Sequence, residues 1–222
     1  MFNIKSIYYY FLALRISLLK FIKKVYFSTN YYNKSLISKT PQQFYFHPNP
    51  FLLSSITNYK KNSFKISDID PNIFWIKQKN IKGEKDINSF LWLNLMDRKS
   101  DGKSLQKIIS IWMIKYSKYK TIIWDSSVIS KRIISWILNV DIILKDGLFE
   151  FKKNFLNSLI SQSNHLKKNI KFEKDHSKRV EILSALLLSG LVFKEYKENY
   201  NVALKELEKL VKDFFDEDGF PL

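Results

Sequence analysis

From about Ser104 onward, apolar side chains recur every three or four positions, as they do on one face of an α-helix. Five such segments follow one another, with expected helix starts near residues 104, 126, 150, 177 and 201. Short polar linkers separate them, and short linkers place each helix antiparallel beside its predecessor. The pattern predicts an all-α fold of antiparallel helical hairpins, either a bundle or an arc that forms part of an (α/α) toroid.

Details within these segments add expectations about caps and burial. Asp125 and Ser126 precede the second segment and are residue types that cap helix N-termini. The fourth segment, from Ser177 to Tyr196, is apolar nearly all round its middle, so we expect it to be the most buried helix. The chain ends in DGFPL, turn chemistry that normally leads into another element. We therefore expect the N-terminal part of a longer protein.

Residues 1–27 form a separate predicted amphipathic helix. Its longest charge-free run, Ser6–Leu14, is far shorter than the roughly 20 residues of a spanning helix, and no cleavage site of small residues follows. We expect the helix to pack on the rest of the fold; a surface-lying membrane helix and an unusual signal or anchor are the alternatives. Its apolar positions are Ile7, Phe11, Leu14, Leu18, Phe21, Ile22 and Val25, and basic residues elsewhere around it are Arg15, Lys20, Lys23 and Lys24.

Residues 28–90 differ from both flanking regions. They carry four of the five prolines and many aromatic residues, which predicts an extended, irregular arm. Alternation of apolar and polar residues over 62–83 indicates one or two short strands or a wrapping arm. The predicted organisation is thus a helix at 1–27, an arm at 28–90 and a partial toroid at 91–222.

Composition and charge narrow the classes of function. The chain has 222 residues and a formal charge of +16, but only four of its 37 basic residues are Arg. The bias toward Lys, Ile and Asn is what an A/T-rich genome produces by codon drift, and nucleic-acid sites usually use Arg. We therefore expect a basic surface but no nucleic-acid partner. The absence of Cys excludes thiolate chemistry, and the few His residues form no metal motif, so no metal or cofactor is expected.

An ordered set of residues resembles the N-terminal toroid half of the heparinase II/III-like polysaccharide lyases. The likeness covers about residues 90–222 and is vaguer in the arm. The residues that carry it are Trp124, then Arg132 and Trp136 as R-x-x-x-W, His165 with Leu166, a late Gly190 in the apolar helix, and Asp218 with Gly219. The resemblance implies a bacterial protein with a β-sandwich domain beyond Leu222. It also implies β-elimination of an anionic, uronate-containing polysaccharide, whose charge the basic chain would suit.

Such chemistry needs groups that bind the uronate carboxylate and move a proton. Family members carry much of this set downstream of the point where this chain ends, so the catalytic residues stay unidentified and the chain alone is expected to be inactive. Arg179 stands about where many lyases have the Asn of an Asn-His pair. The candidate substrate-binding residues here are Arg132, Trp136, Asn164, His165 and Arg179.

Each candidate also has a purely structural interpretation. Arg132 and Trp136 share a helix face, where the Arg could stack on an indole at the edge of the core. His165 fits a surface or helix-end position, whereas Trp75, Trp92 and Trp112 fit core or arm packing. Without catalysis, the chain would be a basic helical module that binds an anionic membrane or envelope surface, with peripheral contact through the N-terminal helix. The compartment, cytoplasm or envelope, stays open.

Overall fold

The fold is known from a computed structural model that describes residues 4–57, 65, 70–75, 81–214 and 216. Over these residues the secondary structure is helical and contains no β-strand, which confirms the predicted all-α class. The elements in chain order are α1 (Ile4–Ser28), α2 (Asn30–Ser35), α3 (Ser54–Thr57), α5 (Pro71–Phe74), α6 (Ile81–Asn88), η2 (Leu91–Leu95), α7 (Gly102–Tyr116), α8 (Ser126–Leu138), α9 (Val140–Ile143), α10 (Phe149–Asn169), η3 (Ile170–Phe172), α11 (His176–Val192), η4 (Lys194–Tyr196) and α12 (Lys197–Phe214).

The five expected helix starts are close to the observed starts of α7, α8, α10, α11 and α12. Side-chain caps explain three of them. Asp125 accepts a hydrogen bond from the Ser127 amide at 3.2 Å, as the sequence predicted, and Asp101 and Asp175 cap α7 and α11 in the same way. The second segment is interrupted, because α8 ends at Leu138 and the chain restarts as the short α9.

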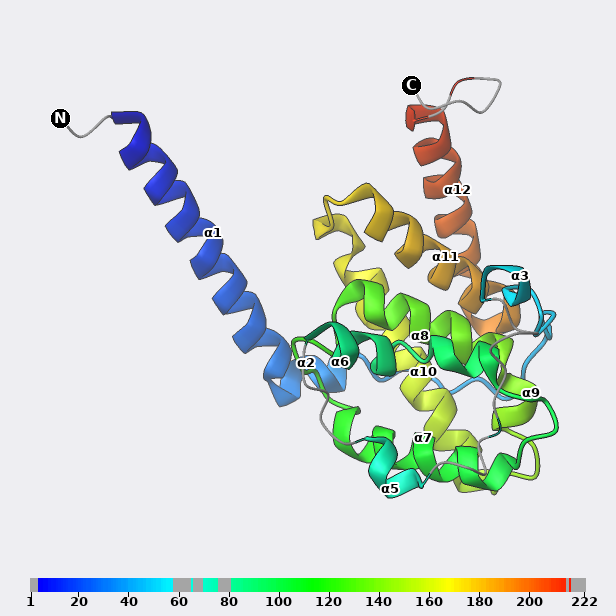
Figure 1. The fold of residues 1–222 in the computed structure, drawn as a ribbon. Helices are drawn as coiled ribbons and strands as arrows, with labels where there is room; N and C mark the ends of the chain where they lie inside the picture. The colour runs from blue at the N-terminus through cyan, green and yellow to red at the C-terminus, as the bar shows by residue number, and fades with distance from the viewer. Residues whose placement is uncertain (1–3, 58–64, 66–69, 76–80, 215, 217–222) are drawn as a thin grey trace.

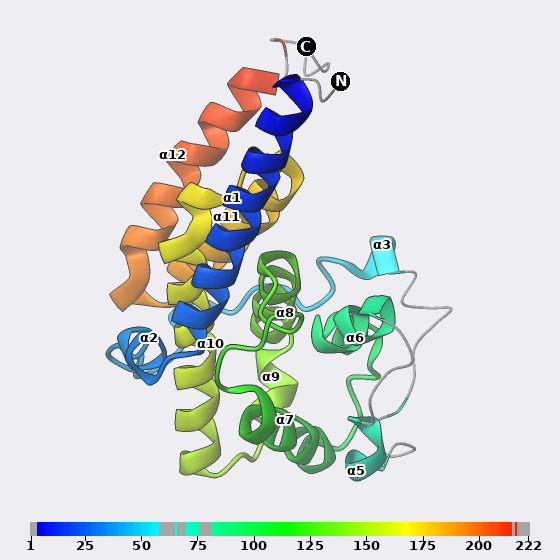
Figure 2. The same ribbon diagram turned by 90° about the vertical axis from the view of Figure 1, so that its left-hand side faces the viewer.

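Neighbours in space follow the chain order only in part. α11 and α12 form an extensive antiparallel hairpin, as the short linker predicted (Figure 1). The main neighbour of α8, however, is α11, with α10 second, while α7 packs against α5, α9 and α10. α8 therefore lies at the centre of the body, with the other helices around it (Figure 2).

The prediction that residues 177–196 form the most buried helix is wrong. Most positions of α8 are buried, whereas Val180 and Leu191 of α11 are exposed. Both helices are rich in apolar residues, and local hydrophobicity does not show which one has neighbours on every side. The central place of α8 depends on long-range packing.

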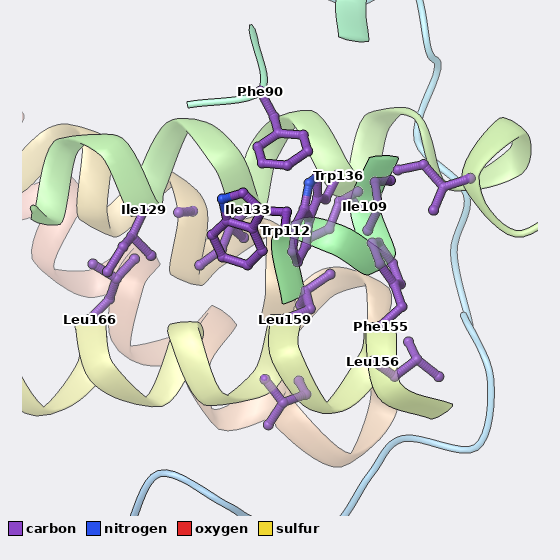
Figure 3. Close-up of a cluster of buried hydrophobic side chains, with 14 of the residues drawn as sticks. Phe90, Ile109, Trp112, Ile129, Ile133, Trp136, Phe155, Leu156, Leu159 and Leu166 are labelled. Atoms are coloured by element: carbon purple, nitrogen blue, oxygen red, sulfur yellow. The ribbon is translucent and has the colours of Figure 1, made fainter. Parts of the chain in front are cut away.

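Aromatic side chains fill the space between α8, α10 and the segment before η2 (Figure 3). The Phe90 ring lies 5.2 Å from Trp136 and 5.6 Å from Trp112 between ring centroids, both edge-on. Phe90 has a left-handed backbone, φ 58°, which costs a non-glycine residue about 1 kcal/mol or more. This conformation persists because the turn must aim the ring into the centre of the core.

The arm follows the body and is not a free linker. The Tyr45 amide donates to the Val192 carbonyl at 2.8 Å, and the Tyr196 hydroxyl donates to the Lys39 carbonyl at 2.7 Å. Of the stretch expected to form strands or a wrapping arm, Pro71–Phe74 is helical, and much of the rest lies outside the described residues. Whether the hairpins belong to a toroid stays a prediction.

Gly190 sets how closely α11 and α12 approach. A Cβ at this position would lie 2.2 Å from the Tyr200 backbone nitrogen and 2.9 Å from the Tyr196 carbonyl oxygen. We expect Gly190→Ala to lower the free energy of unfolding by about 3 kcal/mol, because backbone on both sides must move apart. Urea denaturation measures the loss. Ser184→Ala on the same helix should change stability by less than about 0.5 kcal/mol; equal stability of the two variants would contradict the close approach.

Candidate functional site

The helix α1 projects away from the body and exposes apolar side chains along its length (Figure 1). Among the α1 side chains whose burial the structure describes, residues 7–28, Phe27 in the last turn is the one that is buried, so the expectation that this helix packs on the rest of the fold is wrong over most of its length. The Tyr10 side chain, for example, is 81% exposed. The large exposed side chains on α1 are Ile7, Tyr8, Tyr9, Tyr10, Phe11, Leu12, Leu14, Ile16, Leu18, Leu19, Phe21, Ile22, Val25 and Tyr26.

The apolar stripe of α1, defined by Ile7, Phe11, Leu14, Leu18, Phe21, Ile22 and Val25, is exposed along its length, and near the base Phe21 and Val25 border a small hollow with Tyr119 and Thr121 of the body. At about 3.6 residues per turn, these seven positions fall within roughly a third of the circumference. Phe27 and Lys23, which contact the body, lie on nearly the opposite side. From Ile7 to Leu18 the stripe is therefore open to a flat surface that approaches from outside.

Aromatic packing attaches the base of α1 to the body. The Phe27 ring lies 4.5 Å from Tyr32, 5.0 Å from Tyr119 and 5.2 Å from His165 between centroids. The Lys23 ammonium lies over the rings of Phe27 and Phe172, at 5.3 and 5.1 Å, and burial lowers the pKa of this ammonium. These contacts hold the C-terminal end of α1 on the body and leave the remainder of the helix in solvent.

A chain of buried hydrogen bonds between α2 and α10 supports the attachment of α1. The Asn169 amide donates to the Tyr32 hydroxyl at 3.0 Å, and this hydroxyl lies 2.7 Å from His165 Nδ1. With the proton of Tyr32 directed to Nδ1, the imidazole is the neutral tautomer that carries its proton on Nε2. Burial, assisted by Lys23 and Arg132, lowers the pKa of His165 to about 3, and burial raises the pKa of Tyr32 to about 12.

The charge on α1 is entirely positive. The helix contains no Asp or Glu, and Arg15, Lys20 and Lys24 are exposed. In the described part of the chain, none of these three cations forms an ion pair within 4.0 Å. The Lys171 ammonium, 5.0 Å from the Phe172 ring, adds charge near the base. Arg15 and Lys24 lie beside the apolar stripe, whereas Lys20 lies on the opposite face of the helix. An apolar stripe with unpaired cations at its two borders is suited to an anionic surface.

Arg132 was expected to contact substrate or cap the edge of the core, and the structure encloses it completely. Its guanidinium donates to Gln162 Oε1 at 2.5 Å, to the Asn88 carbonyl at 2.7 Å and to the Ile123 carbonyl at 3.2 Å. It stacks on Trp112, at 4.4 Å from the ring centroid, and burial lowers its pKa well below the ordinary value. All three guanidinium nitrogens have acceptors within the protein, so this group cannot reach a polysaccharide in this conformation.

The other expected substrate contacts also have internal roles. Trp136 is fully buried against Phe90, and His165, predicted at the surface or a helix end, is only 2% exposed. Asn164 donates to the Leu36 carbonyl and to Ser38 Oγ, both at 2.9 Å, which holds the arm against α10. Arg179 binds Glu206 at 3.2 Å between α11 and α12. The structure thus distributes the five residues through the body and does not bring them together in one cleft.

Of the Trp residues expected in the core, Trp75 and Trp112 are buried and use their indole nitrogens internally. Trp75 donates to the Ile108 carbonyl and Trp112 donates to Asn88 Oδ1, both at 2.8 Å.

Among the residues that the structure describes, no group of three or more His, Cys, Asp or Glu could hold a metal ion. No helix in the same residues combines the length and apolar character needed to cross a bilayer.

Comparison with known proteins adds no relative: no family model, curated protein or solved structure matches the chain.

The internal role of Arg132 can be tested by removing its charge while keeping its bulk. We expect Arg132→Met to lower the free energy of unfolding by about 3 kcal/mol, because buried carbonyl acceptors lose their donors. Its neighbour Lys131 makes a surface ion pair with Glu181, so Lys131→Met should cost less than about 1 kcal/mol. Chemical denaturation compares the two. A stable Arg132→Met variant would mean that the guanidinium is not structural.

The buried neutral His165 makes stability depend on pH. Its folded pKa of about 3 lies below the ordinary 6.5, so the unfolded chain binds this proton more readily. The resulting stability is present above pH 6.5 and is lost toward pH 3, by up to about 1.4 kcal/mol per pH unit. His165→Gln should show a shallower decline over this window in urea denaturation at stepped pH. Parallel profiles for the two proteins would contradict the assignment.

Proposed function

We propose that this protein attaches peripherally to anionic membrane surfaces through α1. The observation that carries the proposal is the exposure of the apolar stripe, which is open to solvent from Ile7 to Leu18, on a helix without acidic residues. A helix of this kind lies in the membrane interface with its apolar face among the acyl chains and its cations at the headgroups. The four Tyr residues on α1 suit the same interface, because their rings are apolar and their hydroxyls polar.

The geometry allows this attachment without rearrangement of the body. Phe27 and Lys23 hold the base of α1 through the face opposite the outer part of the stripe, Ile7 to Leu18, so the body would stay in water while that part of the helix lies on the membrane. At about 1.5 Å per residue, α1 is roughly 37 Å long and offers a long contact line. Arg15 and Lys24, which lie beside the stripe, would each add about 1 kcal/mol near an anionic leaflet.

The stripe can be tested with Phe11→Glu combined with Leu18→Glu. We expect this variant to bind vesicles of phosphatidylglycerol and phosphatidylcholine at least about tenfold more weakly than the wild type, because two charges would replace two inserted side chains. Co-sedimentation measures the bound fraction. The matched control is Phe149→Glu with Val211→Glu, which changes exposed apolar residues on α10 and α12 and should leave binding unchanged.

Salt and lipid charge provide the second arm of the test. Binding should weaken as ionic strength rises, because the Debye length shortens to about 3 Å at 1 M salt. Equal binding to vesicles of phosphatidylcholine alone, or equal loss in the control variant, would refute an anionic membrane partner. If the protein binds no vesicle at all, the stripe would be assigned to a protein partner instead of a membrane.

The polysaccharide-lyase hypothesis stays a prediction. Arg132, Trp136 and His165 are buried, so these expected contact residues form no open site for a polysaccharide. Release of unsaturated uronate products from glycosaminoglycans, alginates or bacterial uronans would support it.

A further inference from the structure

A hollow of about 730 Å³ lies between α7 and α10, on a surface separate from the α1 stripe. This volume is within the roughly 300–1,000 Å³ of small-molecule sites. Ser110 and Ser117 mark its extent on α7, and Glu150 and Ser161 mark it on α10. Between the last two residues α10 rises about 16 Å, at about 1.5 Å per residue. The hollow is thus an elongated groove.

Most of the groove's wall is apolar. Met113 and Ile114 line it from α7, Phe151 lines it from α10, and Leu148 and Ile37 stand near its two ends. Ile114 is 83% exposed and Leu148 80% exposed, although both are large apolar side chains. An apolar molecule in the groove would remove this surface from water, which is favourable at about 25 cal/mol per Å².

One end of the groove is cationic. The Tyr119 amide donates to Asn33 Oδ1 at 3.2 Å, and this bond brings the chain neighbours of the two residues, Lys118 and Lys34, to the same end. Neither ammonium forms an ion pair within 4.0 Å among the described residues. The acidic residue of the lining, Glu150, lies in the first turn of α10, toward the opposite end. The groove therefore has an apolar length and a positive end.

Two of the four Asn side chains in the lining already use their hydrogen-bonding atoms within the protein. Asn33 already donates to the Thr29 carbonyl at 2.7 Å and accepts from Tyr119, and Asn157 Oδ1 already accepts from Thr40. A polyhydroxyl ligand needs several polar groups that converge on it, whereas most of the exposed area of this lining is apolar, although polar residues also contribute to it. A ligand with one charged head and a long apolar body matches the lining better.

We propose that the groove between α7 and α10 binds a long-chain fatty carboxylate. Its alkyl chain lies along Met113, Ile114 and Phe151, and its carboxylate lies between Lys34 and Lys118. The interaction is non-covalent, and it uses a different surface from the membrane contact of α1.

The test titrates the full chain with dansyl-labelled undecanoic acid below its critical micelle concentration. We expect saturable binding of one probe per chain, and displacement by dodecanoic acid but not by dodecanol. Asn154→Trp, which fills the groove from α10, should abolish binding, while Lys153→Trp on the adjacent exposed position should not. Lys34→Gln with Lys118→Gln should weaken binding at least tenfold. The charge-matched control is Lys107→Gln with Lys115→Gln, outside the lining on α7, which should change nothing.

Several results would overturn the proposal. They are absence of saturable binding, equal displacement by dodecanol, and unchanged binding in Asn154→Trp. Loss of probe binding in Phe11→Glu with Leu18→Glu would place the probe on the α1 stripe and would also refute the groove. Retention in that variant, with vesicle binding lost, would support the groove independently of the membrane proposal. Displacement by an amphipathic helical peptide but not by dodecanoic acid would assign the groove to a protein partner.

Discussion

The enclosed guanidinium of Arg132 is the constraint around which the body is organised. A buried cation is tolerated only when its hydrogen bonds are satisfied, and here the acceptors come from three separate places in the chain. Asn88 ends α6, Ile123 lies in the turn before α8, and Gln162 is on α10. The ring of Trp112 brings in α7 as well. A shift of any one of these elements would leave a nitrogen of the buried guanidinium without an acceptor. The positions of the elements around α8 are therefore narrowly defined.

The position of α10 determines what α1 can do. The same helix that supplies Gln162 to Arg132 presents His165 and Asn169 to Tyr32 on α2, less than two turns further on. Phe27, the last buried residue of α1, packs on both Tyr32 and His165. The direction of the projecting helix therefore depends on a chain of contacts that starts in the core. Such a base lets a long exposed helix keep a defined angle to the body without burying its apolar stripe.

The sequence predicted the helices well because their signals are local. Apolar period and cap residues are contained within a few turns, and Asp125 was recognised as a cap from its immediate neighbours alone. Arg132 shows the limit of this reasoning. Its spacing to Trp136 indicated a stack within one helix, but the ring it contacts belongs to Trp112, on another helix. His165 was misplaced for a similar reason, since its partner Tyr32 is 133 residues away in the chain. Periodicity shows that a helix has an apolar face, and tertiary packing decides which face is covered.

Periodicity is equally limited for α1, because it does not show whether the apolar stripe packs on the body. The stripe serves the proposed function and does not contribute to the stability of the fold. An amphipathic pattern is equally compatible with packing on the body and with lying on a lipid surface, and the exposure of the stripe from Ile7 to Leu18, beyond the anchor at Phe27 and Lys23, distinguishes the two. Because the stripe makes no contribution to the core, its residues are free to suit an external surface. Substitutions on the stripe should then act on binding alone, whereas changes at His165 should affect both folding and the angle of α1. This difference arises because α1 is held at its base. The sequence of the projecting part can therefore change to suit a binding surface without loss of stability of the body.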